Sequence, residues 1–552
     1  MSILKNKLEY LFYFLAIFFL YFFQIKDWNG EYLDTDCYFH ALRMINWFEY
    51  PSFWEQKMGW SNYPIGEVSH WTRVIYIVWG VLTLPFLLFY KLKDAVFNAG
   101  LLISPLFLVL SVMFLVATLK DFLNTKLRFL VLILLFVQAN FIRTAYFNRP
   151  DHHVMFVFLS ILILYFVNLF NKSKDEKYLT TIAFTLSVAL WLAVEGVFLF
   201  TFFVVYLFVL YWKFGCKYDY LLKVSFYYAV GVSIWWCINP CYEGWLYVDV
   251  GRLSIFWVVL CWLGFYALKI AQNEENKIKQ IGIIGGVFTL GVVALYCLIG
   301  FNSPIDERIY PIFINRITEM NGVNLYTGAY SFIAIILGGI LYGRMKNNEL
   351  FWYLLISLIG YTILSMKGIR FLPYSSLYAV VIIAMFLQQR LFDGKKIRAL
   401  VIFFVLLEYI SFILNLLIWG SVFEKPAPTI YFNGLDNLPQ GSVVTDTFFA
   451  PHFVWYGNRP VVASPYHGNV EGLLDNHEIL FSSDDSKVIE LLKKHKVGAN
   501  YLSETSDNFY YKPLENCDKL YGKILGCKNY PDWLIPVNNT DGSLFKIDYN
   551  KI

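Results

Sequence analysis

The sequence predicts a polytopic α-helical membrane protein with about 13 transmembrane helices, followed by an extracytoplasmic domain of mixed α/β structure. Three observations predict this fold class. Of the 552 residues, 58% are hydrophobic and only 16% are charged. Apolar runs of about 17–25 residues recur, which is the length that a helix needs to cross a bilayer. From about residue 424 onward the composition becomes polar.

The apolar runs give the order of the predicted membrane helices. No small-residue cleavage site follows the first run, so we expect a retained helix and not a signal peptide. A further run at 74–90 contains a proline and is bounded by Arg73 and Lys91. We expect it to lie on the membrane or dip into it. The predicted spans are 8–25, 99–119, 127–142, 154–170, 180–195, 196–212, 222–238, 253–270, 281–300, 327–342, 350–366, 371–388 and 398–420.

The positions of Lys and Arg predict the orientation of these spans. Short cytoplasmic loops of membrane proteins carry an excess of both residues. With a cytoplasmic N-terminus and no crossing at 74–90, the basic loops all fall on the cytoplasmic side, and a crossing there would break the rule. We therefore expect a membrane domain over 1–423, with a large first external loop at 27–98, and an extracytoplasmic domain over 424–552.

The polar tail predicts a small α/β domain. Residues 441–446 are typical of a turn and a strand, and 497–502 of a second strand. Between them, 486–496 has the apolar spacing of an amphipathic helix. Cys517 and Cys527 could form a disulfide outside the cytoplasm, and two free thiols are the alternative. No pair among the eight cysteines has metal-site spacing.

The first external loop carries a dense group of polar side chains. Asp34 and Asp36 lie two residues apart, and His40 and Arg43 follow within ten residues. Paired carboxylates are a common way to hold a divalent metal ion or to activate a nucleophile. A solvated loop with a local ion pair is the alternative interpretation.

The second external loop ends in Asp151-His152-His153, directly before the span 154–170. Ionisable groups at the entry to a membrane helix are costly and usually functional. Asp and His are both ligands for Mn²⁺, Zn²⁺ or Fe²⁺. The alternative is that Asp151 only caps the helix and that the histidines are incidental.

Two more external positions carry charge. Glu319 follows the ninth predicted span, and Lys367 and Arg370 precede the span 371–388. Taken singly, Glu319 is a solvated acid and Arg370 an interfacial anchor. Taken together, acids that can hold a metal share one membrane face with cations that can hold phosphate. A divalent ion that bridges carboxylates and a diphosphate assists departure of the leaving group.

On this topology the motifs resemble those of the catalytic subunit of oligosaccharyltransferase, a GT-C membrane glycosyltransferase, and indicate a bacterial side branch. In that family the first external loop opens with Asp-x-Tyr and a later Arg. Residues 36–38 and Arg43 match this pattern. The second acidic motif of the family matches Asp151, with His152 where the family usually has another polar or acidic residue.

The later motifs resemble the same family. Its fifth-loop motif ends in Glu and fits Glu319 loosely, and its phosphate-binding Arg-Phe-x-x-Tyr matches residues 370–374. The family reads an Asn acceptor through Trp-Trp-Asp-Tyr-Gly. This chain has Val-Trp-Tyr-Gly at 454–457, without the double Trp or the Asp, and continues with Ser-Pro-Tyr-His-Gly-Asn at 464–469.

The resemblance implies a role for each of these side chains. Those that would bind Mg²⁺ or Mn²⁺ are Asp36, Asp151, His152 and Glu319. Those that would be catalytic are Asp36, which orients and activates the acceptor, and Glu319. Those that would bind the donor phosphate are Arg370 and Lys367. Those that would contact the acceptor are Trp455, Tyr456, Tyr466 and His467, while Asp34 and Arg43 would support Asp36.

The implied activity is transfer of a glycan from a polyprenyl-(di)phosphate-linked donor to a protein, lipid or polysaccharide acceptor at a bacterial inner membrane. The net charge of +4 gives no indication of nucleic-acid binding. One alternative is a transferase that modifies lipid or cell-surface polysaccharide instead of protein. Another is a transporter of a lipid-linked glycan, which would carry its charges near the bilayer midplane. The charges here lie at helix ends and in external loops, which favours an enzyme.

Overall fold

The chain forms two compact units in the computed structural model. The membrane unit comprises 1–31, 71–301 and 318–422, and the sheet unit comprises 32–70, 302–317 and 423–552. A domain boundary at residue 423 stays a prediction, and the predicted span 398–420 lies largely outside the described residues. The structure describes all residues except 1, 27, 53–56, 70, 300–304, 324, 390–394, 397–398, 401, 404–405, 408–409, 411–434, 436–437, 502–516, 526, 528 and 538–543.

The membrane unit is helical and polytopic. Within the described residues, eight helices are long and apolar enough to cross a membrane, and shorter apolar helices accompany them. Apart from 127–142, each predicted span up to 371–388 overlaps one main described helix. The helices are α1 (Ser2–Lys26), α3 (Val74–Phe86), α4 (Leu92–Gly100), α5 (Ile103–Leu119), α6 (Thr125–Phe136), α7 (Ala139–Thr144), α8 (His152–Ser173), α9 (Lys177–Leu192), α10 (Gly196–Phe214), α11 (Asp219–Ile238), α12 (Ile255–Ala271), α13 (Lys277–Ile299), α14 (Leu325–Met345), α15 (Glu349–Ser365) and α16 (Leu372–Gln388).

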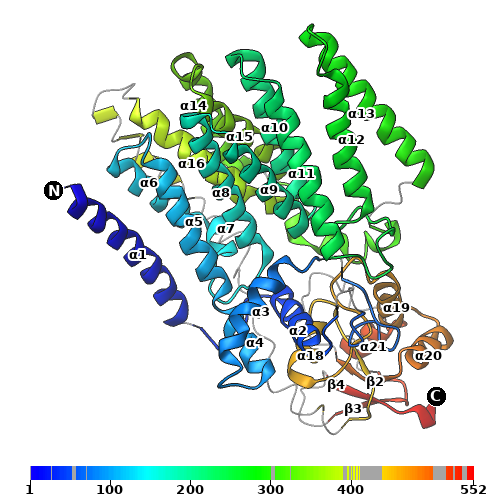
Figure 1. Ribbon diagram of the computed structural model, residues 1–552. Coiled ribbons are helices and arrows are strands. Elements are labelled where there is room, and N and C mark those ends of the chain that lie inside the picture. Colours follow the sequence, from blue (N-terminus) through cyan, green and yellow to red (C-terminus); the bar gives the residue numbers. More distant parts are fainter. Residues whose placement is uncertain are drawn as a thin grey trace. The chain divides into compact units, whose positions relative to one another are not determined.

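Helix α16 lies at the centre of this unit. The apolar segment that contains it is 94% buried, and α16 contacts α6, α14 and α15. A helix that is apolar all round is stable only where neighbours cover every side, and the packing around α16 provides this cover. Away from α16, the bundle continues through α8, α9, α11, α12 and α13, each of which contacts the next (Figure 1).

Two apolar runs differ from simple spans. The run 74–90 contains α3, whose 13 residues extend for only about 20 Å, less than the hydrocarbon thickness of about 30 Å. The predicted span 127–142 is divided into α6 and α7. The break lies at Gln138, which has extended backbone (φ −80°, ψ 113°) and begins α7. A polar residue inside an apolar run marks this interruption.

A buried ion pair attaches α1 to α6. The Arg128 guanidinium makes two hydrogen bonds to Glu9, from Nε at 2.7 Å and from a terminal nitrogen at 2.8 Å. The Tyr13 hydroxyl also donates to Glu9. A bidentate bond of this kind fixes direction as well as distance, so it sets the register of α1 against α6.

The sheet unit contains a four-stranded mixed sheet in the order β1-β2-β4-β3. Strands β1 and β2 are parallel, and the other neighbours are antiparallel. Two short 3₁₀ helices, η1 (Glu307–Ile309) and η2 (Ile314–Arg316), also belong to this unit. The remaining elements are α2 (Thr35–Glu49), β1 (Ser442–Val444), α18 (Ala450–Gly457), α19 (Val470–Phe481), α20 (Asp485–Lys494), β2 (Val497–Tyr501), α21 (Leu520–Leu525), β3 (Leu534–Pro536) and β4 (Leu544–Ile547).

The predicted mixed α/β character of the tail is confirmed. The predicted amphipathic helix is α20, and its apolar side chains Val488, Leu491 and Leu492 join the core formed with the sheet. Asp484 caps α20 by accepting two backbone N–H bonds from its first turn. Cys517 and Cys527 are joined as a disulfide, with 5.9 Å between their Cα atoms.

Candidate functional site

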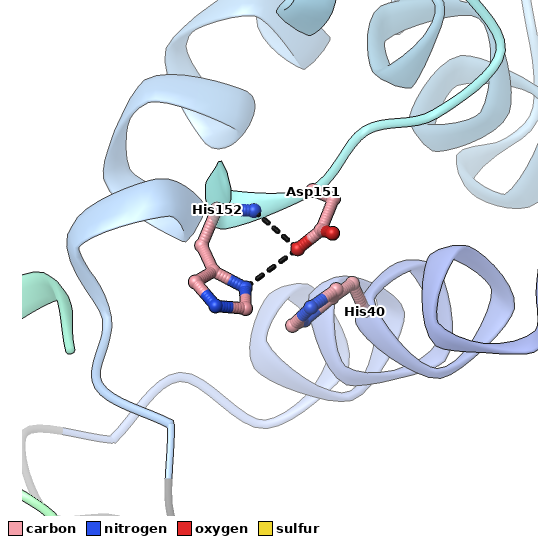
Figure 2. A group of neighbouring side chains, drawn as sticks. All are labelled: His40, Asp151 and His152. Atoms are coloured by element: carbon pink, nitrogen blue, oxygen red, sulfur yellow. Dashed lines mark hydrogen bonds and ion pairs between the residues drawn. The ribbon is translucent and has the colours of Figure 1, made fainter. Parts of the chain in front are cut away.

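Asp151 stands at the start of α8 and is held there by its own helix. Its backbone is extended, and its Oδ1 accepts the backbone N–H of His152 at 2.5 Å. The same oxygen lies 2.5 Å from His152 Nδ1. Figure 2 shows both interactions. Asp151 is therefore the helix cap that the simpler interpretation expected, and it also orients an imidazole.

The loop that leads to Asp151 is fixed by hydrogen bonds from three other parts of the membrane unit. The Ser104 hydroxyl of α5 donates to the Arg149 carbonyl at 2.5 Å. The Tyr21 hydroxyl of α1 donates to the Ala145 carbonyl at 3.0 Å, and the Asn148 side chain donates to the Glu31 carbonyl at 3.0 Å. The side chains of this loop are thus placed by a rigid backbone.

Glu319, more than 160 residues later in the chain, lies beside this loop. It belongs to the 3₁₀ helix η3 (Thr318–Met320). One terminal nitrogen of Arg149 is 3.2 Å from Asp151 Oδ2 and 3.2 Å from Glu319 Oε1. His153 Nε2 also lies between the two acids, at 3.9 and 3.6 Å. We call Asp151, His152, His153 and Glu319 the acid–imidazole cluster.

The sequence indicated the motif Asp151-His152-His153, but no specific role was proposed for His153 or for Arg149. Both lie within two positions of Asp151, so the signal was present in the spacing. Arg149 is almost fully buried, with a side chain 3% exposed. A buried arginine is stable only when it is paired, and its two carboxylate partners here supply that pairing.

The charges of the cluster keep both carboxyl groups ionised. Burial raises the pKa of Asp151, but the nearby charges of His152, His153 and Arg149 outweigh it and lower the pKa well below its usual range. For Glu319 too, burial is outweighed, chiefly by His153 and then by Arg149, and the pKa is lowered. The cluster therefore presents two anionic acids beside imidazoles at neutral pH.

The loop that carries Lys367 and Arg370 runs along the segment that follows Glu319. The backbone N–H of Ile369 donates to the Asn321 carbonyl at 2.8 Å, and that of Val323 to the Ser365 carbonyl at 2.9 Å. These bonds hold the Arg370 loop against the Glu319 loop. Lys367 itself is exposed.

Arg370 forms an ion pair that the sequence did not predict. Its terminal nitrogen lies 3.0 Å from Glu195 Oε1, just before α10. The available signal was an acid placed between two apolar runs, 180–195 and 196–212. Such an acid is expensive at a membrane and usually has a function.

In the sheet unit, Asp34 and Asp36 take different positions on α2. Asp34 caps the helix by accepting the Cys37 backbone N–H at 3.2 Å. Asp36 lies in the first turn, and its Oδ1 accepts the Tyr466 hydroxyl at 3.1 Å. Asp36 thus contacts a predicted acceptor-binding residue.

The other predicted acceptor-binding residues gather on the same helix. The Tyr38 hydroxyl of α2 lies 2.7 Å from the Tyr456 hydroxyl of α18. The Trp455 ring packs against Tyr38 with 5.8 Å between centroids. His467 is partly exposed just after Tyr466. The structure therefore brings Trp455, Tyr456 and Tyr466 to α2, where Asp36 lies.

Three further polar side chains of α2 and α18 are buried. His40 and Arg43, further along α2, are both buried, and Figure 2 also labels His40. The His452 ring of α18 lies 4.5 Å from the Tyr38 ring. Burial lowers the pKa of His452 to about 4, so this imidazole is neutral at pH 7.

A buried polar network involves residues on both sides of Tyr466 in the sequence. Glu67, with 4% of its surface exposed, accepts hydrogen bonds from the Ser61 hydroxyl at 2.7 Å and from the Ser464 hydroxyl at 2.7 and 2.8 Å. Asn469 donates to Ser61 at 3.3 Å. The network thus joins the segment on both sides of Tyr466 to the loop at 58–67.

Glu67 should make the stability of the protein depend on pH. Burial raises the pKa of Glu67 from 4.5 to about 7, although the Ser464 and Ser61 hydroxyls act to lower it. The folded state therefore binds the proton more tightly. The contribution of this proton to the free energy of unfolding is fully present below about pH 4.5. It falls by up to about 3 kcal/mol as the pH rises through 7. Glu67→Gln should remove this loss, so the variant should melt higher than the wild type at pH 8. Equal slopes of melting temperature between pH 5 and 8 would contradict this prediction.

No model of a known protein family and no curated protein matches this sequence. Among solved structures, the chain is similar to the archaeal oligosaccharyltransferase AglB from Archaeoglobus fulgidus in complex with an inhibitory peptide and a dolichol-phosphate. The TM-score is 0.63 at 12% identity, over 85% of this chain and 65% of that chain. The chain has the oligosaccharyltransferase fold. Because the identity is so low, the likeness is one of fold.

Two further structures of the Archaeoglobus fulgidus oligosaccharyltransferase give the same result. The complex with Zn and sulfate matches with a TM-score of 0.62 at 13% identity, over 86% of this chain and 64% of that one. The form tethered to an acceptor peptide containing the NVT sequon matches with a TM-score of 0.66 at 13% identity, over 89% of this chain and 69% of that one. The chain thus spans about two thirds of the length of these oligosaccharyltransferases.

Proposed function

We propose that this chain is an integral-membrane glycosyltransferase that moves a glycan from a polyprenyl-phosphate or polyprenyl-diphosphate donor to an acceptor on the extracytoplasmic face. One observation carries the proposal. Within an oligosaccharyltransferase fold, the acid–imidazole cluster includes Glu319, and the segment that follows Glu319 is hydrogen-bonded to the loop that carries Arg370. Acids that suit a metal ion therefore accompany a cation that suits phosphate.

The chemistry of the cluster fits a divalent metal ion. In its neutral form with the proton on Nδ1, the nitrogen beside Asp151, the His152 ring would offer the lone pair of Nε2 to a metal ion. Asp151 and Glu319 supply carboxylate oxygens. Imidazoles favour Mn²⁺ or Zn²⁺ over Mg²⁺, and one of the similar solved structures is a complex with Zn. When bound, the ion would polarise the donor phosphate as a Lewis acid.

Arg370 is proposed to bind the donor phosphate. As the bond from the anomeric carbon to the phosphate oxygen breaks, its electron pair stays on that oxygen and negative charge grows there. A guanidinium offers several N–H donors to phosphate oxygens and stabilises this charge. Lys367, exposed on the same loop, would add a second cation.

Asp36 is proposed to orient the acceptor. Its carboxylate would accept a hydrogen bond from the nucleophilic group and would take the proton of that group as it attacks the anomeric carbon. Tyr466 already donates to Asp36 and so fixes the carboxylate. Trp455 and Tyr456 would provide an aromatic contact for the acceptor beside Tyr38.

The nature of the acceptor divides the proposal into two forms. The solved structures with a dolichol-phosphate and with an NVT-containing peptide support a lipid-linked donor and a peptide acceptor. The sequence at 454–457 lacks the double Trp and the Asp of the family motif, which favours a lipid or polysaccharide acceptor. The basic loops support a cytoplasmic N-terminus in either case.

Mass spectrometry of the transferred glycan tests the function. The purified chain is added with Mn²⁺ to membranes from a strain that lacks it, and peptides, lipids and polysaccharide are compared with and without the protein. We expect the donor lipid to lose its glycan and one acceptor class to gain it. Glycopeptides would support the peptide form, and a glycan gained by lipid or polysaccharide would support the other. If the donor lipid moves between leaflets but stays chemically intact, the chain is a transporter and the proposal is wrong.

A further inference from the structure

The phosphate-binding candidate Arg370 already has an anionic partner in the protein. Glu195 Oε1 lies 3.0 Å from its terminal nitrogen, and the two side chains are 21% and 31% exposed. The pair is therefore partly open to solvent and not locked inside the helix bundle. An anion that binds Arg370 would therefore share the guanidinium with the Glu195 carboxylate.

Glu195 owes its position to a tight turn between α9 and α10. Helix α9 ends where Ala193 takes extended backbone (φ −157°, ψ 150°), and Glu195 then begins α10. A Cβ atom on Gly196 would lie 2.3 Å from the Ala189 backbone, so only glycine permits this turn. The Phe198 N–H donates to the Glu195 carbonyl at 3.0 Å. The carboxylate thus projects from a fixed helix start.

Arg370 is also held by its surroundings. Its guanidinium carbon lies 5.2 Å from the centre of the Phe371 ring, and that ring packs edge-on against Phe198 at 5.7 Å. Phe198 follows Glu195 on α10. The contact between Phe371 and Phe198 therefore holds the Arg370 loop against α10, the helix that Glu195 precedes.

The guanidinium keeps capacity for a second anion. An arginine has five N–H donors, and Glu195 lies against one terminal nitrogen. Among the described residues, the buried Nε of Arg370 has no hydrogen-bond partner. Nε is buried, but about a third of the side chain is exposed, so we expect a phosphate to approach the terminal N–H donors while Glu195 stays in place.

Glu195 is charged at neutral pH. Burial raises the pKa of Glu195, but Arg370, the backbone, His152 and His153 together outweigh burial and lower the pKa. The Glu195 carboxylate therefore interacts electrostatically both with Arg370 and with the imidazoles of the acid–imidazole cluster. An anion that binds Arg370 meets this negative charge as well.

We propose that Glu195 is a positioning residue and counter-ion for Arg370, which directs the guanidinium toward the donor phosphate and limits its affinity so that the lipid phosphate product can leave. This inference rests on the proposed function, because it takes Arg370 as the phosphate ligand. Removing the charge of Glu195 while keeping its shape should tighten phosphate binding. Removing Arg370 should abolish that gain.

Pyrophosphate binding to the purified full chain tests this. Glu195→Gln keeps a hydrogen-bond acceptor for Arg370 and should bind pyrophosphate about 10-fold more tightly, equivalent to about 1.4 kcal/mol. The double variant Glu195→Gln, Arg370→Ala should show no gain over Arg370→Ala alone. Glu349→Gln is the matched control, because Glu349 pairs with Lys174 elsewhere in the membrane unit. It should bind as the wild type does.

Glu195→Asp keeps the negative charge and should bind pyrophosphate with the wild-type affinity. A purely structural role of the Glu195 side chain would not predict this result. Glu195→Ser is a second charge-removing variant should the Gln variant not fold, with melting temperature as the check. Unchanged or weaker binding in a folded charge-removing variant would overturn the inference. Tighter binding that depends on Arg370, without any glycan transfer, would leave the counter-ion role intact and reject the proposed function. Glycan transfer by the wild type, together with unchanged pyrophosphate binding in Glu195→Gln, would support the proposed function and reject the counter-ion role.

Discussion

Asp151→Asn is expected to lower glycan transfer by about 100-fold or more while the protein stays folded. Asn can still accept the His152 backbone N–H and so cap α8. It cannot supply the negative charge that holds the His152 Nδ1 proton and balances Arg149. The cluster would then lose one anionic ligand and the orientation of one imidazole.

Two measurements check this prediction. Consumption of the lipid-linked donor at fixed Mn²⁺ reports the activity, and equilibrium dialysis of Mn²⁺ against the purified chain reports the site directly. Asp121→Asn is a suitable control, because Asp121 pairs with Lys172 outside the cluster. We expect the control to keep wild-type values in both assays. Activity and Mn²⁺ affinity of Asp151→Asn within about threefold of wild type would reject a metal role for the cluster.

Asp36→Ala is expected to reduce transfer by about 1,000-fold, which is close to complete loss in a membrane assay. The carboxylate is the only part of this side chain that can orient a nucleophile. Asp36 is half-buried in the first turn of α2, where Tyr466 donates to it. Alanine suits a helix, so α2 should remain intact.

Asp34 provides the comparison that separates the two neighbouring acids. Asp34→Ala removes the cap of α2 and should cost about 1 kcal/mol of stability, with transfer reduced far less than in Asp36→Ala. Tyr466→Phe removes one hydrogen bond to Asp36 and should reduce transfer by about 10-fold. Initial rates of transfer, measured beside melting temperatures, distinguish these effects. If Asp34→Ala proved the more damaging to transfer, the assignment of Asp36 would be wrong.

Much of the membrane unit could be predicted because its signal is local. A run of apolar residues long enough to span a bilayer must form a helix, since lipid offers no partners to an open backbone. This reasoning located α8 and α16 correctly from their residues alone. It missed the division of 127–142 at Gln138, because a break of two residues barely changes the hydropathy of a run.

The candidate site was predicted only in part. The Asp151-His152 pair is local, so adjacency in sequence already implied contact. Asp36 and Tyr466 were proposed as separate members of one site, but their contact spans 430 positions and no local pattern encodes it. Glu195 appeared only as the end of an apolar run, so its pairing with Arg370 was not foreseen.

By itself the sequence determined that this is a helical membrane protein with a polar α/β tail, and it led to a proposal of which acids, imidazoles and cations carry the chemistry. These features depend on composition, run length and short spacing, which are properties of neighbouring residues. Only the tertiary structure decided that Arg149 bridges Asp151 to Glu319 and that Arg370 faces Glu195. The physical reason is that charges buried at helix ends need partners, and packing of distant helices selects which partner each one meets.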